Sequence, residues 1–144
     1  MHADNAFTLI ASHIEYQGYK LVPSREYYMN PLTKEVGYVR RSKPKIKIIS
    51  LLHEYGHIVQ SPCSLGLKNS KSRNKAFIVA TEYNAWIEGK NLANHLGIIP
   101  DTITEEEYDD EMAKYWVTYF DTVVYESQKD IKYLVDIYKE GLAI

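Results

Sequence analysis

Apolar side chains recur along much of this chain at intervals of three and four residues, which is the spacing of one helix face. This pattern predicts helices over about residues 3–17, 45–59, 74–96, 104–124 and 130–140. Two shorter runs rich in β-branched and aromatic residues, 19–22 and 35–40, lie between turn residues and predict two or three short strands. We therefore expect a mainly helical α+β fold with a small antiparallel sheet, formed by residues 1–144 as one domain.

Residues with strong preferences for helix ends support these boundaries. Asp4 or Asn5 is expected to cap the first helix, and Gly18 is expected to end it. Thr104 and Glu107 have the spacing of a capping box, in which each side chain bonds the backbone N–H of the other residue. The acidic residues that follow suit the first turns of a helix, because negative charge is favourable there, and they lack the spacing of a calcium loop.

Composition changes this picture little. A hydrophobic share of 45% and a charged share of 25% are ordinary for a globular chain of 144 residues. The single cysteine, Cys63, excludes an internal disulfide and fits a reducing compartment. The N-terminus lacks a secretory pattern, and no apolar run reaches the roughly 18–20 residues of a membrane span. We expect a cytoplasmic protein, in the host cytoplasm if the protein is viral, with no membrane partner.

Charge gives one feature to interpret. The formal net charge is −2, so the whole molecule has no field that would attract nucleic acid. One run is basic, however, and its members are Arg40, Arg41, Lys43, Lys45 and Lys47. This run could bind nucleic acid, or it could be a solvated loop and first helical turn. We favour the solvated loop, because no stacking aromatic residues or glycine loop accompany the charges, and we expect no nucleic-acid partner.

The strongest chemical signal is the sequence His53-Glu54-Tyr55-Gly56-His57 inside the predicted helix 45–59. Residues four apart lie above one another on a helix, so His53 and His57 can direct two imidazoles at one zinc ion. In this pattern Glu54 is the general base that activates a zinc-bound water. A shuffled chain of the same composition would contain the pattern about 0.014 times. The alternative is a pair of partly exposed helical histidines without a metal.

Two imidazoles leave zinc short of protein ligands, and Glu82 is the best candidate for the third. It is the only polar residue on one face of the helix 74–96, where a lone carboxylate needs a cation or strong donors. The apolar members of this face are Ile78, Val79, Ala85, Trp86, Gly89, Ala93 and Leu96. Gly89 and Ala93 would let another helix approach closely. Glu88 and His95 point away from this face, and Cys63 could be a ligand but is more typical of a small buried hydrophobe.

A His-Glu-x-x-His motif followed 25 residues later by Glu82 resembles the gluzincin branch of zinc metallopeptidases. The segment Glu82-Tyr83-Asn84-Ala85-Trp86 is similar to the Glu-x-x-Ala segment of ImmA/IrrE-type and related phage-encoded metallopeptidases. The resemblance covers about residues 36–97 and implies a zincin-like domain in which His53, His57 and Glu82 hold zinc. The sequence departs from the family at Asn84 and Trp86. A deformylase is not expected, because no cysteine precedes the motif.

The resemblance also implies a reaction. Glu54 would take a proton from the zinc-bound water and deliver it to the leaving amine, and a further donor would stabilise the oxyanion. The sequence leaves that donor open among Tyr38, Tyr83, Tyr115, Tyr119 and His95. We expect a zinc-dependent endopeptidase with a protein or peptide substrate. The alternative is a non-catalytic regulatory or binding protein on a zincin scaffold, with a structural metal.

Overall fold

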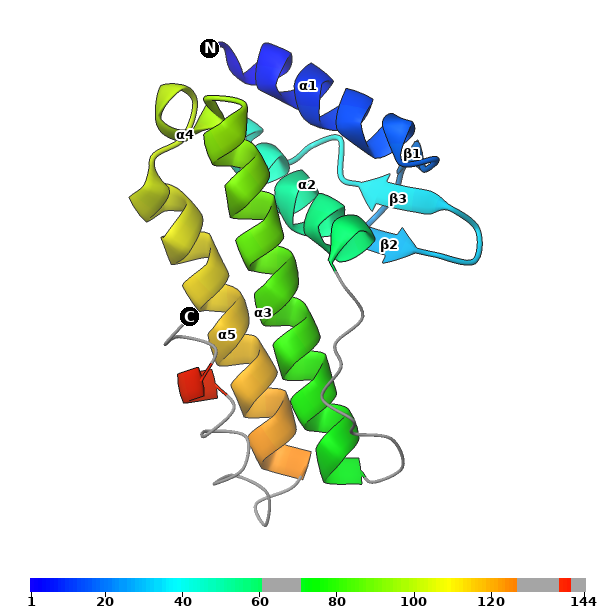
Figure 1. Cartoon of the computed structure of the whole chain (residues 1–144), viewed down its shortest axis with the longest axis vertical. Coiled ribbons are helices and arrows are strands. Elements are labelled where there is room, and N and C mark those ends of the chain that lie inside the picture. The colour runs from blue at the N-terminus through cyan, green and yellow to red at the C-terminus, as the bar shows by residue number, and fades with distance from the viewer. Residues whose placement is uncertain (61–70, 127–137, 141–144) are drawn as a thin grey trace.

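Figure 1 shows the computed structural model of the chain, which describes residues 1–60, 71–126 and 138–140. Its helices and strands, in chain order, are α1 (Ala3–Tyr16), β1 (Lys20–Pro23), β2 (Tyr28–Asn30), β3 (Glu35–Tyr38), α2 (Pro44–Val59), α3 (Lys71–His95), α4 (Ile98–Asp101) and α5 (Glu105–Glu126). This confirms a mainly helical chain with a small sheet. Only residues 138–140 of the last predicted helix are described, and they are helical. None of the helices in the described ranges is long and apolar enough to cross a bilayer.

The three strands form a mixed sheet in the order β1-β3-β2. β2 and β3 are antiparallel, with Tyr28 opposite Gly37, whereas β1 and β3 are parallel, with Leu21 opposite Val36. The prediction of an antiparallel sheet is therefore wrong for one of the two pairs. The pattern of β-prone residues locates strands but does not encode the path of residues 24–27, which carries the chain from β1 past β3 to the far edge.

Most helix ends lie within two residues of the predicted positions, but α3 begins at Lys71, three residues before its predicted start, and the cap of α1 differs. α1 begins at Ala3, and the side chain of His2 accepts a hydrogen bond from the backbone N–H of Asp4 at 3.1 Å. The prediction of Asp4 or Asn5 as the cap is wrong, because both residues lie inside the first turn. The capping box of α5 is confirmed: the N–H of Glu107 donates to Thr104 Oγ1 at 3.0 Å, and the N–H of Thr104 donates to Glu107 Oε1 at 3.1 Å.

α2 lies at the centre of the fold, between α1 and the sheet on one side and α3 on the other (Figure 1). Its apolar residues and those of its neighbours form one core, whose fully buried large side chains include Ile10, Ile14, Ile48, Leu51, Leu52, Trp86, Ile103 and Tyr108. On α3 the predicted apolar face is buried at Val79, Ala85, Trp86 and Ala93. Ile78 is a correction, because its side chain is 50% exposed.

Two glycines let the backbones of α2 and α3 touch. A Cβ atom on Gly56 would overlap the carbonyl oxygen of Ala85, and a Cβ atom on Gly89 would overlap the carbonyl oxygen of Leu52. The close approach predicted for Gly89 is therefore confirmed, and Gly56 supplies its counterpart on α2. Because Gly56 lies inside the motif, the same contact brings Glu82 of α3 toward the two histidines.

We expect Gly56→Ala to lower the free energy of unfolding by about 2 kcal/mol, because overpacked interiors lose roughly 1–3 kcal/mol. A loss of stability would be informative, because Ala in place of Gly inside a helix ordinarily stabilises the helix by about 0.5–1 kcal/mol. Urea denaturation followed by circular dichroism measures the change. Asn94→Ala, at an exposed position of α3, is the control and should stay within about 0.5 kcal/mol of the parent protein. A Gly56→Ala protein as stable as the parent would contradict the close contact.

Candidate metal centre

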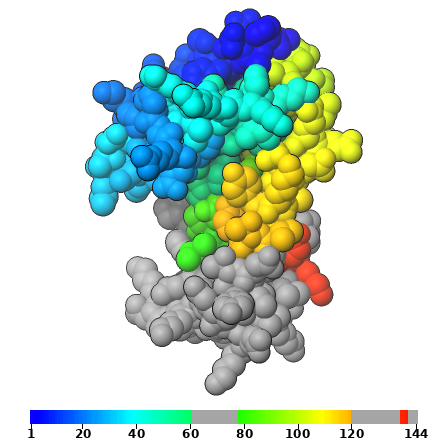
Figure 2. Space-filling model, turned by 180° about the vertical axis from the view of Figure 1, so that it is seen from behind, coloured from blue at the N-terminus to red at the C-terminus, as the bar shows by residue number. Residues whose placement is uncertain are grey.

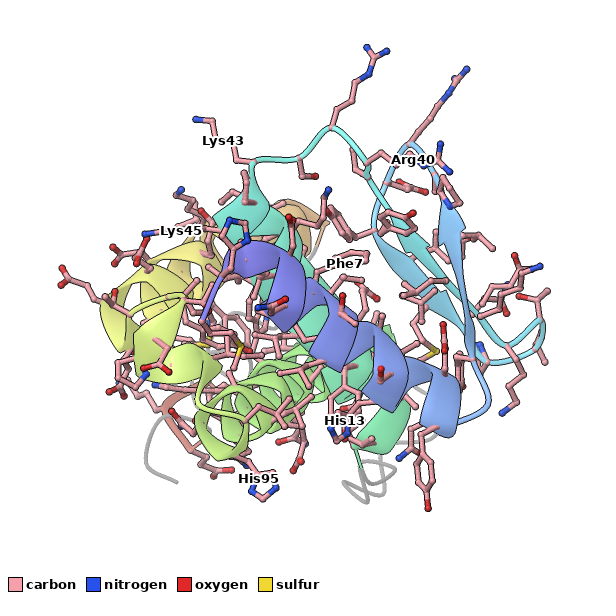
Figure 3. All side chains as sticks on the ribbon, turned by 90° about the horizontal axis from the view of Figure 1, so that it is seen from above. Phe7, His13, Arg40, Lys43, Lys45 and His95 are labelled. Carbon is pink, nitrogen blue, oxygen red and sulfur yellow. The ribbon has the colours of Figure 1, made fainter. Side chains whose placement is uncertain are left out.

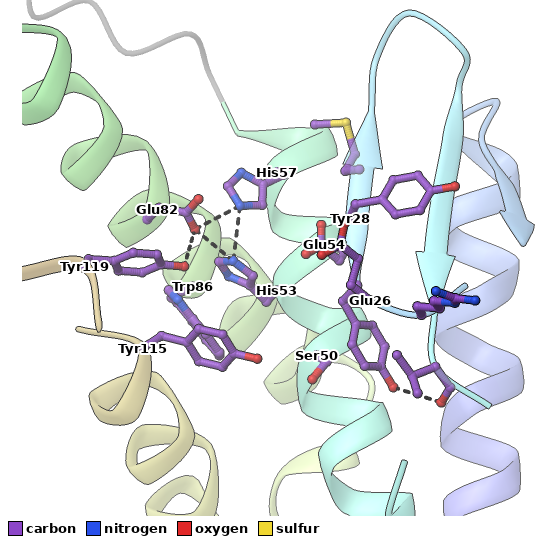
Figure 4. A pocket seen from close by; sticks show the side chains of 14 residues that line it. Glu26, Tyr28, Ser50, His53, Glu54, His57, Glu82, Trp86, Tyr115 and Tyr119 are labelled. Carbon is purple, nitrogen blue, oxygen red and sulfur yellow. Dashed lines mark hydrogen bonds and ion pairs between the residues drawn. The ribbon is translucent and has the colours of Figure 1, made fainter. Parts of the chain in front are cut away.

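Two helices bring three ligand-type side chains to one point (Figure 4). His53 and His57 project from successive turns of α2, and Glu82 projects from α3. Glu82 Oε2 lies 2.9 Å from His53 Nε2 and 3.0 Å from His57 Nε2, and the two Nε2 atoms are 3.1 Å apart. The three side chains are mostly buried, with 8%, 14% and 20% of their surfaces exposed. The three residues that the sequence selected as ligands are thus neighbours in the fold.

This triangle has the size and chemistry of one face of a tetrahedral metal site. Ligand atoms at about 2.0–2.1 Å from a zinc ion are about 3.3 Å apart when the geometry is tetrahedral. The observed separations of 2.9 to 3.1 Å are a few tenths of an ångström shorter. Two imidazole nitrogens and one carboxylate oxygen also form a common donor set for zinc. His53, His57 and Glu82 therefore form a group that could hold a metal ion.

The surroundings favour an uncharged His53 and an ionised Glu82, as a metal needs, but they favour the protonated form of His57. Burial lowers the pKa of His53, and the hydrogen bond to Glu82 only partly opposes this effect. Burial disfavours the ionised carboxylate of Glu82, but the hydrogen bonds from His53 and His57 outweigh it and hold its pKa well below the usual range. Burial likewise disfavours a charged His57, but the hydrogen bond and charge of Glu82 raise its pKa. At neutral pH Glu82 is ionised, and a cation between the rings would favour the neutral form of His57.

Neighbouring side chains hold the ligands in place. Tyr119 Oη donates a hydrogen bond to Glu82 Oε2 at 2.9 Å. The Gln60 amide lies 2.9 Å from His57 Nδ1, so it can fix the ring while Nε2 faces the centre. The ring of His53 stacks on Trp86, with centroids 4.1 Å apart and an angle of 27° between the planes. His53 Nδ1 has no hydrogen-bond partner among the described residues, so aromatic packing orients this ring.

Glu54 lies beside the ligand group, and only 7% of its surface is exposed. Burial raises the pKa of Glu54 to about 7, and the charge of His57 opposes this effect only in part. A carboxyl group with a pKa near the working pH can both accept and release a proton, which is the property of a general acid–base group.

In the metal-free protein this burial costs stability above pH 4.5. The folded-state pKa is raised, so the unfolded chain ionises first and stability falls as the pH rises from about 4.5 through about 7. We expect Glu54→Gln to stabilise the metal-free protein at pH 8 by on the order of 3 kcal/mol and to change little at pH 4, since one pKa unit is about 1.4 kcal/mol. Thermal unfolding at both pH values tests this. Glu88→Gln is the control, and equal stabilities at pH 8 would contradict the prediction.

The ligand group lines an open cleft with a volume of about 630 Å³. One wall is formed by residues 25–29 and Val39 of the sheet region, and the opposite wall is formed by Tyr115 and Tyr119 of α5. Ser50, one turn before His53, also lines the cleft. In Figure 2 the recess lies between the blue residues of the β1–β2 region and the gold residues of α5, with green residues behind it.

The structure separates the candidates that the sequence left open for the further donor. Tyr115 and Tyr119 line the cleft. Tyr38 lies outside it and packs on Phe7, with ring centroids 5.6 Å apart, and Tyr83 packs on Trp116. His95 is exposed at the end of α3 (Figure 3). Cys63 lies outside the described residues. Sequence reasoning missed Tyr27, Tyr28 and Gln60, because nothing in their local pattern distinguishes them from ordinary turn, strand and helix-end residues.

Comparison with known proteins finds no matching family model, no matching curated protein and no matching solved structure. The resemblance to ImmA/IrrE-type metallopeptidases therefore stays a prediction from the sequence motif. The interpretation of the site depends on its own geometry and chemistry.

Proposed function

We propose that this protein is a zinc-dependent metallopeptidase that hydrolyses internal peptide bonds of a protein substrate. His53, His57 and Glu82 hold the zinc ion, and Glu54 is the general base. The observation that carries this proposal is the convergence of two imidazole nitrogens and one carboxylate oxygen, within 3.1 Å of one another, beside a buried glutamate in an open cleft. The donor set favours zinc, because two imidazoles and a carboxylate with one open position are typical of catalytic zinc sites.

The chemistry divides between the ion and the chain. A zinc ion bound here would supply Lewis-acid polarisation and would lower the pKa of water. Glu54 accepts a proton from the attacking water and donates it to the leaving amine, which its pKa of about 7 permits in both directions. Tyr115 provides a hydroxyl donor in the cleft for the developing oxyanion, whereas the hydroxyl of Tyr119 already donates to Glu82. Burial raises the pKa of both tyrosines, so both stay protonated donors at neutral pH.

The shape of the cleft suits an extended polypeptide. β2 is one of the two edge strands of the sheet, and Tyr28 and Met29 of this strand line the cleft wall. An edge strand presents unpaired backbone N–H and C=O groups to which a peptide can add as a further strand. A substrate bound in this way passes through the cleft, which favours cleavage inside a chain over removal of a terminal residue.

Metal analysis together with a cleavage assay tests the proposal. We expect about one zinc ion per chain by mass spectrometry of the purified protein, and cleavage of peptides from a proteome-derived library, followed by mass spectrometry. Cleavage should stop on chelation and return with zinc. A protein that neither retains zinc nor gains thermal stability from it would contradict the proposal. A protein that binds zinc but cleaves no peptide would instead be the non-catalytic binding protein.

A further inference from the structure

Four exposed cations lie on two neighbouring loops, and one of them, Arg25, lines the cleft. Arg25 precedes β2, whereas Arg40, Arg41 and Lys43 lie between β3 and α2. We call Arg25, Arg40, Arg41 and Lys43 the cation cluster. In the part of the chain that the structure describes, none of the four has an ion pair. Lys45, by contrast, is paired with Glu107 at 2.8 Å, so it is already neutralised.

Hydrogen bonds fasten the two loops to each other at the end of the cleft. Tyr27 Oη lies 2.8 Å from Ser42 Oγ and 3.4 Å from the carbonyl oxygen of Val39. The N–H of Ser24 donates to the carbonyl oxygen of Tyr38 at 2.8 Å. Arg25 and Val39 themselves line the cleft. Figure 3 shows Arg40 and Lys43 at the same edge of the molecule, and the cyan residues above the recess in Figure 2 belong to this region of the chain.

Acidic groups near the cluster leave its positive charge largely uncompensated. Glu26 is the exposed carboxylate on the same wall. On α5, Glu107 is paired with Lys45 and Glu111 is paired with Lys114 at 2.6 Å. Asp110 is exposed on the same helix. The strand side of the cleft therefore has a cation at Arg25, and the rest of the cation cluster adds unpaired positive charge on the neighbouring loop.

We propose that the substrate is a protein segment with acidic side chains on the C-terminal side of the cleaved bond, which the cation cluster binds. This inference rests on the proposed peptidase function. The direction of the bound peptide follows from the direction of β2. This strand begins at Tyr28, next to the cluster, and runs away from it. A peptide that adds antiparallel to β2, the commoner of the two pairings, has its C-terminal part at the cluster.

The geometry also limits how far the acidic residues can lie from the cleaved bond. Lys43 caps α2, and about ten residues separate it from His53. At about 1.5 Å per residue this helical stretch spans roughly 15 Å. An extended peptide covers about 3.3 Å per residue, so the acidic side chains should lie within about five residues after the cleaved bond.

A nucleic acid fits the same cluster less well. Four cations on two short loops form a small patch, and Glu26 next to Arg25 interrupts it, so it offers little to a long polyanion. The adjoining wall is a free strand edge, which matches a polypeptide backbone and not a phosphate backbone. The acidic peptide is therefore the ligand that accounts for both the charge and the strand edge.

Peptide binding to the zinc-loaded Glu54→Gln protein tests the inference without turnover. The probes are three fluorescent peptides of 14 residues or so: one with four acidic residues in its C-terminal half, one with them in its N-terminal half, and one with amides in their place. We expect the first to bind at least tenfold more tightly than the neutral peptide at low salt. Adding Arg25→Ala and Arg41→Ala should remove most of this difference. Lys20→Ala with Lys139→Ala, which removes the same charge elsewhere, should preserve it.

Equal affinities for the three peptides, or an acidic preference that survives Arg25→Ala with Arg41→Ala, would overturn the inference. Tighter binding of the N-terminally acidic peptide would overturn the stated polarity. Tighter binding of a short DNA duplex, lost in the same variant, would overturn it in favour of nucleic acid. Cleavage of acidic and neutral peptides at equal rates by the unmodified protein would refute the inference and leave the peptidase function intact. Selective binding without any cleavage would support the acidic ligand and refute the peptidase function.

Discussion

Replacing Glu54 by Gln should lower the rate of peptide hydrolysis by about 10²- to 10⁴-fold, which is the usual contribution of a positioned general base. Gln keeps the size and hydrogen-bonding shape of the side chain but cannot accept the proton of the attacking water. Zinc content should stay near one per chain, because Glu54 is not among the three ligand residues. Initial rates on one cleaved peptide, measured together with metal content, separate the loss of the base from the loss of the metal.

Glu88→Gln is the matched control for this experiment. Glu88 also lies on a helix of the core, but it is not among the residues that line the cleft. This variant should retain the parent rate within a factor of about two, since substitutions away from such features usually have small effects. A Glu54→Gln protein that cleaves at the parent rate would show that another group accepts the proton. The same substitution should also stabilise the metal-free protein at neutral pH, because the burial that raises the pKa of Glu54 destabilises the metal-free fold there.

Local spacing explains why part of this site could be predicted from sequence. His53 and His57 lie on one helix face whatever the rest of the fold does, so their pairing required only a helix over the motif. The prediction of Glu82 as the third ligand required one further argument, which is that a single carboxylate on an otherwise apolar face needs a partner. The glycines that bring this face against α2 could be recognised on α3 at Gly89. Their counterpart, Gly56, is hidden inside the motif, where the sequence indicates chemistry and not packing.

The remainder of the site depends on elements that meet only in the folded chain. Tyr119 is 37 residues from Glu82 in sequence, and five side chains were equally eligible as the further donor until α5 was placed. The strand wall is a similar case. Tyr27 and Tyr28 reach the cleft only because β2 pairs with β3 and occupies the sheet edge. The β-prone pattern does not specify strand order or direction, so neither the mixed sheet nor this wall follows from it.

Replacing Glu82 by Ala should lower the affinity for zinc by more than about 100-fold, because even the outer groups that orient ligands contribute about 10- to 100-fold. In the parent protein zinc should raise the melting temperature, since a ligand that binds only the folded state stabilises it. In Glu82→Ala the added zinc should have little effect. Isothermal titration with zinc and thermal unfolding at matched zinc concentrations measure the two quantities.

A graded variant makes this prediction sharper. Tyr119→Phe removes one hydrogen bond to Glu82 Oε2 and leaves the carboxylate in place, so its zinc affinity should fall by about tenfold, well short of the loss in Glu82→Ala. Glu88→Ala, on the same helix as Glu82, should bind zinc like the parent. If Glu82→Ala bound zinc with unchanged affinity, the third ligand would have to come from elsewhere, and Cys63 would be the first residue to replace. We therefore expect the zinc affinity to decrease in the order parent, Tyr119→Phe, Glu82→Ala. This order follows from the convergence of α2, α3 and α5 on one point.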